Sequence, residues 1–187
     1  MYNWIKKYIL FTAAVFVISV LTAVYAVQET HVTGNSMSPC LRNGESVLVD
    51  KTAYQRKEPE RYDVVVFRYL YEADSYYIKR IIGLPGETVQ IKDGSVHIDG
   101  EKLEDPFGGI EIVDAGRAAE PVHLKEDEYF VMGDNRNYST DSREDKVGNV
   151  RRQQILGKAV RKLRSTRETQ LGCLEKPEKQ LCGDEKG

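Results

Sequence analysis

The stretch YYIKRIIGLPG, residues 76–86, decides the fold class of this 187-residue chain. Its first seven residues are rich in aromatic and β-branched side chains, a composition typical of a buried β-strand. The Gly-Leu-Pro-Gly that follows is a strong turn signal, because glycine adopts positive φ angles and proline presets φ for a turn. The stretch therefore predicts a strand that ends abruptly and that carries two cations, Lys79 and Arg80.

Similar patterns elsewhere predict a mostly β domain. An Asp-Gly pair at 93–94 separates two short alternating runs, as in a tight hairpin. Residues 101–121 hold few apolar side chains and several glycines and prolines, so we expect a long excursion outside the core. Residues 154–163 fit either a last strand or a short helix. Further strands are predicted at 47–49, 63–68, 88–91, 96–98 and 129–132.

Residues 8–27 contain no charged side chain and predict a transmembrane anchor. A helix of this length spans about 30 Å, the thickness of the hydrocarbon core of a bilayer. Lys6 and Lys7 precede the segment, so the positive-inside rule places residues 1–7 in the cytoplasm and the rest on the extracytoplasmic face. A cleaved signal peptide ending near 24–26 is the alternative, although the apolar run exceeds the roughly 7–15 residues usual for such peptides.

The rest of the composition limits the classes of function. A net charge of -2 gives no reason to expect nucleic acid as a partner. We expect one extracytoplasmic domain over 28–163 and a flexible polar tail over 164–187, which has too little apolar surface to repay ordering. Cys40, Cys173 and Cys182 form no CxxC pair, so we expect no metal and no cofactor. Cys173 and Cys182 could form a disulfide or remain free thiols.

Two residues suggest a nucleophile and its base. Ser36 lies in the segment GNSMSP at 34–39, which taken alone is also an ordinary turn. Side chains alternate along a strand, so Lys79 and Arg80 face opposite sides. If the Lys79 side is the inner one, burial lowers the pKa of the lysine, and a neutral amine can activate a serine hydroxyl. The strand pattern leaves open the alternative in which Arg80 faces inward and Lys79 is solvated.

A third segment, GDNRNYSTDSR at 133–143, indicates a structured loop. Its short polar side chains hydrogen-bond readily to nearby backbone. Asp141 and Arg143 could form a charge-assisted pair that stiffens it, and Gly133 permits a close backbone approach. A solvated turn is the alternative interpretation.

Together these segments resemble the signature boxes of type I signal peptidases. The matching boxes are SMxP at 36–39, KRIIGLPGE at 79–87 and GDNRxxSxDSR at 133–143, in the family's order. GExVLV at 44–49 resembles a further box, and the resemblance extends from the anchor to about Ala159. The chain is similar to the lysine-dependent, prokaryotic type rather than the type with histidine at that position. Its single anchor and small size resemble the Gram-positive branch.

The resemblance implies two antiparallel β-sheets with Ser36 and Lys79 meeting at a groove. In that family the serine attacks the scissile carbonyl, its own backbone N–H helps hold the oxyanion, and the lysine is the general base. This is a Ser-Lys variant of triad chemistry. Ser139 matches the serine that orients the lysine, and Asp141 and Arg143 match the pair that supports the loop of that serine.

Two positions depart from the family pattern. Gly34 stands where some relatives have a serine that completes the oxyanion hole, so the second oxyanion donor is unassigned. Cys40 replaces the threonine usual in the first box. We expect Cys40 to be a small buried residue rather than a nucleophile.

The function implied by the resemblance is that of a membrane-bound signal peptidase I, a serine endopeptidase of protein secretion. Such enzymes remove N-terminal signal peptides from exported preproteins after small residues, often Ala-x-Ala, without a cofactor. An extended substrate can add as a strand beside an exposed edge, for which residues 29–34 are suitable. A self-cleaving repressor-type protease is disfavoured by the anchor. A non-catalytic factor for pilus or surface-protein assembly is the main alternative, although such relatives lose the nucleophile or the base.

Overall fold

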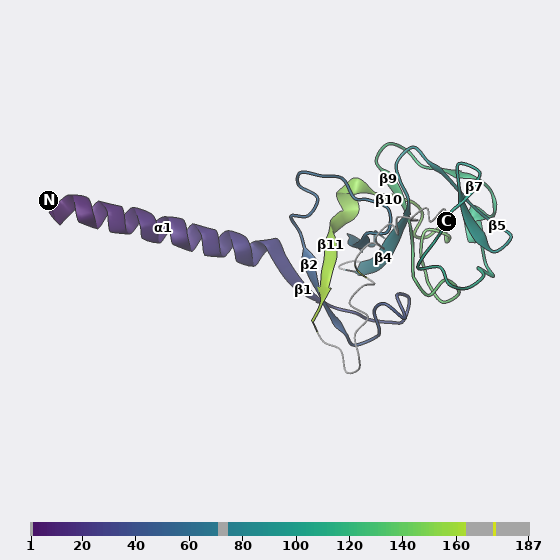
Figure 1. The fold of residues 1–187 in the computed structure, drawn as a ribbon, viewed down its shortest axis with the longest axis horizontal. Helices are drawn as coiled ribbons and strands as arrows, with labels where there is room; N and C mark the ends of the chain where they lie inside the picture. Colours follow the sequence, from purple (N-terminus) through teal and green to yellow (C-terminus); the bar gives the residue numbers. More distant parts are fainter. Residues whose placement is uncertain (1, 71–74, 164–173, 175–187) are drawn as a thin grey trace, which may run out of the picture.

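A long N-terminal helix projects from a β-rich domain in this computed structural model, which describes residues 2–70, 75–163 and 174 (Figure 1). The strands of the described residues form two antiparallel sheets, one of seven strands and one of four. This topology confirms the prediction of a mostly β fold with two antiparallel sheets.

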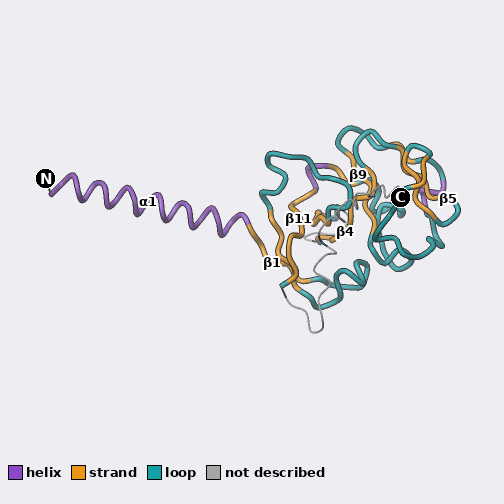
Figure 2. The backbone as a smooth tube through the Cα atoms, in the orientation of Figure 1, coloured by secondary structure: helices purple, strands orange, loops and turns teal. Residues whose placement is uncertain are grey.

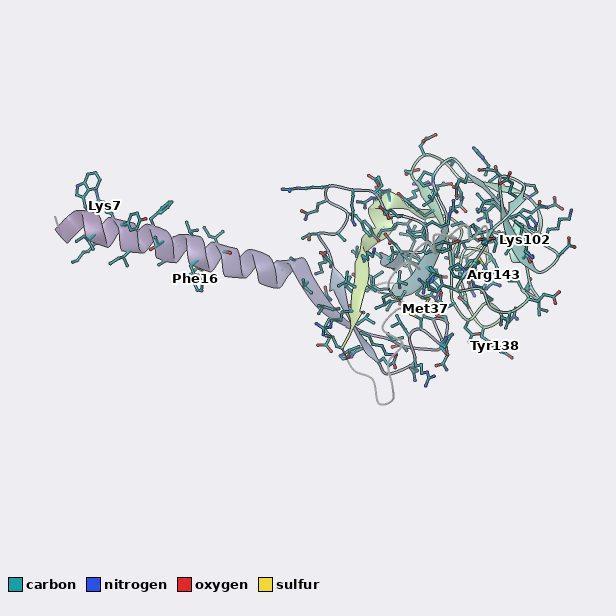
Figure 3. All side chains as sticks on the ribbon, in the orientation of Figure 1. Lys7, Phe16, Met37, Lys102, Tyr138 and Arg143 are labelled. Carbon is teal, nitrogen blue, oxygen red and sulfur yellow. The ribbon has the colours of Figure 1, made fainter. Side chains whose placement is uncertain are left out.

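The helix, α1, extends over Tyr2–Ala26, so it begins and ends earlier than the predicted segment 8–27. Its large apolar side chains are exposed; Phe16, for example, is 70% accessible and lies far from the domain (Figure 3). Over the residues that the structure describes, none of the helices combines the length and the apolar composition that a membrane crossing demands. α1 passes directly into the first strand without an intervening loop (Figure 2).

The larger sheet has the strand order β1-β2-β11-β3-β4-β9-β10. The segment predicted as either strand or helix is strand β11, which pairs with β2 on one side and β3 on the other. It pairs with β3 over residues 155–158 and with β2 over residues 158–162, so its backbone groups find partners along the strand as β-structure requires. The strands are β1 (Val27–His31), β2 (Ser46–Asp50), β3 (Val64–Arg68), β4 (Tyr76–Gly83), β9 (Glu128–Met132), β10 (Val150–Arg151) and β11 (Ile155–Lys162).

The smaller sheet is built around the predicted hairpin. Asp93 and Gly94 have φ angles of 49° and 66°, the positive values that a tight two-residue hairpin loop requires. The sheet has the order β7-β6-β5-β8. Its strands are β5 (Thr88–Lys92), β6 (Ser95–Ile98), β7 (Glu101–Lys102) and β8 (Val122–His123), and two short 3-10 helices, Gly116–Ala119 and Arg152–Gln154, complete the described elements.

The segment 101–121 does contribute to the core, which corrects the prediction of an excursion outside it. Ile112 and Ala118 are buried in the hydrophobic cluster between the smaller sheet and β9. Its apolar residues are too few and too scattered to give a periodic signal, and they are buried only by partners distant in sequence.

Cys40 is buried, as expected, and is also disulfide-bonded, which the sequence did not predict. It lies in a hydrophobic cluster with Met37 and with Leu174. Leu174 is therefore a buried residue within the predicted flexible tail. The suggested pairing of Cys173 with Cys182 falls outside the described residues, as does the remainder of the tail.

Candidate active site

Strand β4 is buried on both sides at its two adjacent cations. Lys79 is 5% exposed and Arg80 is fully buried. Of the two alternatives that strand alternation left open, the one with Lys79 facing inward is confirmed and the one with Lys79 solvated is wrong, and Arg80 is buried on the opposite side as well. Burial of these two side chains is stable only because each has polar partners, as buried charges require.

The Lys79 side chain reaches the predicted nucleophile. Lys79 Nζ donates a hydrogen bond of 2.7 Å to Ser36 Oγ. Ser36 lies in a turn segment after β1. Met37, which follows it, is 1% exposed and belongs to the same hydrophobic cluster as Leu41, so it holds the segment in the core. The structure thus brings together two residues that lie 43 positions apart.

The environment of Lys79 favours its neutral amine. Burial lowers the pKa of Lys79 from 10.5 to about 8, and the charges of Asp141 and Asp134 oppose the shift. The ring of Tyr77, on the same side of β4, lies 5.1 Å from Nζ. With a pKa of about 8, roughly one tenth of Lys79 is unprotonated at pH 7, and the neutral amine is the form that can accept a proton.

Asp141 and Arg143 organise the loop 133–143, which contacts the Ser36 segment. Arg143 Nε and Nη2 donate to the two carboxylate oxygens of Asp141 at 2.8 and 2.9 Å. The same carboxylate accepts the Gly133 N–H at 3.0 Å, and Arg143 Nη2 also reaches the Ser139 carbonyl at 3.4 Å. A fully buried, bidentate pair of this kind fixes the loop far more firmly than an exposed ion pair.

Gly133 lies where the loop meets the nucleophile segment. The N–H of Asn135 donates to the Ser36 carbonyl at 3.0 Å, which joins the two segments. A Cβ on Gly133 would lie 2.3 Å from both the Ser36 carbonyl oxygen and Ser139 Oγ. Only glycine therefore fits between these groups.

The Ser139 hydroxyl lies near the backbone of the nucleophile segment, because a Cβ on Gly133 would be 2.3 Å from both Ser139 Oγ and the Ser36 carbonyl oxygen. Its oxygen is buried and has no hydrogen-bond partner among the described residues. The orienting bond from Ser139 to Lys79 that the resemblance implies stays a prediction.

An ion pair that sequence reasoning missed lies on the other side of β4. Arg80 Nε and Nη2 donate to Asp134 at 2.7 and 2.6 Å, and both side chains are almost completely buried. Both residues belong to matched boxes, Arg80 to 79–87 and Asp134 to 133–143, but neither box indicates that the two side chains pair.

The predicted oxyanion donors are less defined than the contact between Lys79 and Ser36. The Ser36 backbone N–H stays the predicted first donor. The N–H of Gly34, whose φ is 90°, donates to Asn43 Oδ1 at 2.9 Å and so holds the turn itself. The second donor is not assigned by these contacts.

The chain resembles known peptidases over most of its length. The family described as "Signal peptidase, peptidase S26" matches residues 2–163. Signal peptidase I of Bacillus licheniformis is 36% identical over 154 residues, which cover 76% of this chain and 78% of that protein. Signal peptidase I S of Bacillus subtilis (strain 168) is 38% identical over 167 residues, covering 81% and 87%.

Among solved structures, a signal peptidase I from Enterococcus faecalis V583 has 29% sequence identity and a TM-score of 0.45, with coverage of 55% of this chain and 97% of that one. The sequence relationships define the class of protein as a peptidase. More particularly, the chain belongs to the signal peptidase family, peptidase S26, and the resemblance inferred from its boxes is confirmed.

Proposed function

We propose that this protein is a type I signal peptidase that cleaves signal peptides from exported preproteins with Ser36 as nucleophile and Lys79 as general base. The observation that carries the proposal is the 2.7 Å contact between Lys79 Nζ and Ser36 Oγ. Burial lowers the pKa of Lys79 to about 8, which supports the role of base. Membership of the signal peptidase family supports the choice of substrate.

In the proposed reaction, neutral Lys79 takes the proton from Ser36 Oγ as that oxygen attacks the scissile carbonyl. The Ser36 N–H stabilises the oxyanion of the tetrahedral intermediate. The lysine ammonium then returns the proton to the leaving amine, and the acyl-enzyme remains. Water, deprotonated by the same amine, attacks the ester, and the proton passes back to Ser36 Oγ as the signal peptide leaves.

The neighbouring residues take supporting roles in this proposal. Ser139 orients the lysine through its buried hydroxyl. Asp141 and Arg143 hold the Ser139 loop. This agrees with the bonds from Arg143 to Asp141 and to the Ser139 carbonyl.

Substrate binding by strand addition fits the edge of the larger sheet. β1 is the terminal strand of that sheet and pairs with β2 on one side. An extended peptide can bond to its free side, and shallow pockets then admit only small side chains at the positions that face the protein. This favours substrates with small residues at the last and third-to-last positions before the cut.

We further infer that α1 anchors the domain (residues 28–163) in the cell membrane, as a single span with its N-terminus in the cytoplasm. The exposed apolar side chains of α1 need a cover that the domain does not supply, because the helix projects away from it (Figure 1). The full chain is expected to remain with membranes after an alkaline carbonate wash, and a chain lacking residues 1–27 to be released. Release of the full chain would contradict the anchor.

The proposed function is tested by cleavage of a preprotein. The full chain, purified in detergent, is incubated with a preprotein that carries an Ala-x-Ala site, and the product's N-terminus is identified by mass spectrometry. We expect a cut after the second alanine. As a control, a preprotein with a bulky residue in place of that alanine is expected to stay intact. A folded protein that leaves both preproteins uncut would instead favour the non-catalytic assembly role.

A further inference from the structure

A turn in segment 101–121 packs directly behind the dyad strand. The ring centroid of Phe107 lies 3.5 Å from Cζ of Arg80, so the guanidinium stacks on the aromatic face. Tyr62 contacts both partners: its ring centroid is 5.7 Å from that of Phe107, and its carbonyl accepts from Arg80 Nη1 at 2.9 Å. The Tyr62 hydroxyl also donates to the Glu104 carbonyl at 2.6 Å. Phe107 is thereby held in place over Arg80.

A second contact fixes the same turn. Asp105 Oδ2 lies 2.7 Å from Nη2 of the fully buried Arg136, an ion pair without hydrogen-bond alignment. Asp105 also accepts the Phe107 N–H at 3.0 Å on its side chain and the Gly108 N–H at 3.1 Å on its carbonyl. The turn is therefore shaped by Asp105 and attached to the loop that contains Asp134.

Arg80 in turn holds one of the two carboxylates that act on Lys79. Asp134 and Asp141 both oppose the lowering of the Lys79 pKa. Each is engaged by two nitrogens of an arginine, Asp134 by Arg80 and Asp141 by Arg143. An arginine in bidentate contact compensates the carboxylate charge, and a displaced arginine leaves that charge exposed to its neighbours.

We propose that Phe107 is a positioning residue for Lys79, whose ring keeps Arg80 locked on Asp134 so that the carboxylate's charge does not hold Lys79 protonated. The inference rests on the proposed function, in which Lys79 is the base. Cation–π stacking is strongest when the cation is desolvated, as the fully buried Arg80 is.

The groups that face Lys79 make the direction of the effect clear. They are Ser36 Oγ from the nucleophile segment, the Tyr77 ring from its own strand, and Asp134 and Asp141 from the 133–143 loop. Of these, the two aspartates are the groups whose charges act on Lys79. Loosening Arg80 strengthens the field of Asp134 at Lys79, which favours the ammonium and so reduces activity at neutral pH.

The test is the pH dependence of kcat/KM for Phe107→Leu, with Phe107→Trp as the conservative rescue. We expect the leucine variant to move the acidic limb of the kcat/KM profile to higher pH by about 0.5–1 unit. This shift lowers kcat/KM at pH 7 by about 3–10-fold and leaves its plateau at high pH unchanged. The tryptophan variant keeps an aromatic face and a near-wild-type profile. Val113→Ala, in the same segment at an 85% exposed position, is the matched control and should change nothing.

Titration of Lys79 by NMR in the Ser36→Ala background reads the same shift without any cleavage, so it separates this inference from the proposed function. The inference is overturned if, in Phe107→Leu, both the acidic limb of the kcat/KM profile and the NMR titration of Lys79 stay at the wild-type pH. This holds even if the high-pH plateau of kcat/KM falls. If that variant does not fold, Asp105→Asn loosens the same turn, and it is expected to shift the limb in the same direction by less. An unshifted limb there would also overturn the inference.

Discussion

Replacing Ser36 with alanine is expected to abolish preprotein cleavage, with a loss in kcat on the order of 10⁶, because no other group takes over the attack on the carbonyl. Lys79→Met is expected to be as inactive, since the serine hydroxyl then has no base. Ser38→Ala, two residues from the nucleophile, is the matched control and should keep wild-type kcat. Rates are measured by single-turnover cleavage of the Ala-x-Ala preprotein.

The folded state should survive both changes. Lys79 is buried with a pKa lowered to about 8, so the native state disfavours its charge. Methionine has a similar shape without an ammonium, and we expect Lys79→Met to raise the free energy of unfolding at pH 7 by about 1–3 kcal/mol. Denaturant unfolding provides this value. Measurable cleavage by either variant, in protein free of wild type, would refute the dyad.

The same assignment sets the pH dependence of the wild-type enzyme. Below its pKa, Lys79 is an ammonium and cannot accept the serine proton, so kcat/KM falls as pH falls. The rise should have unit slope and a midpoint near the lowered pKa of about 8. A midpoint near 10.5, the ordinary lysine pKa, would mean that burial does not tune the base.

Gly133→Ala is expected to lower kcat by a factor on the order of 10² or more. The new Cβ would lie 2.3 Å from the Ser36 carbonyl oxygen and from Ser139 Oγ, distances that no real contact tolerates. The Ser36 carbonyl belongs to backbone, so the nucleophile segment must move as a whole, and displacement of about 1 Å is enough for a loss of this size.

The strain should also reduce stability by about 1–3 kcal/mol, as overpacked cores do. Gly109→Ala is the control for the loss of a glycine as such, because nothing lies within 4 Å of its Cβ position. We expect that variant to match wild type in both kcat and melting temperature. A Gly133→Ala enzyme with wild-type kcat would show that the 133–143 loop does not constrain Ser36.

Local signals accounted for much of the fold. Strand β4 and its terminal turn, and the hairpin at Asp93 and Gly94, follow from residue types within a few positions of each other. The segment 101–121 was misjudged because Ile112 and Ala118 are buried by strands far along the chain. The bond of Cys40 likewise has no local signature.

The site depended on information that periodicity does not contain. Alternation places Lys79 and Arg80 on opposite sides of β4, but burial of both depends on Ser36 on one side and on Asp134 and Phe107 on the other. The encounter of Ser36 with Lys79 spans 43 positions and was expected only from the resemblance of the boxes to a family.

The junction between α1 and β1 has a mechanical consequence for the anchored enzyme proposed above. The helix ends at Ala26 and the strand begins at Val27, and the Lys51 N–H donates to the Ala26 carbonyl at 2.8 Å. Because no flexible linker separates α1 from β1, the tilt of the helix in the bilayer determines the orientation of the sheet. In that proposed arrangement we expect Ser36 to stay at one height above the lipid, so that substrate choice depends on the distance from the membrane to the scissile bond as well as on side-chain size.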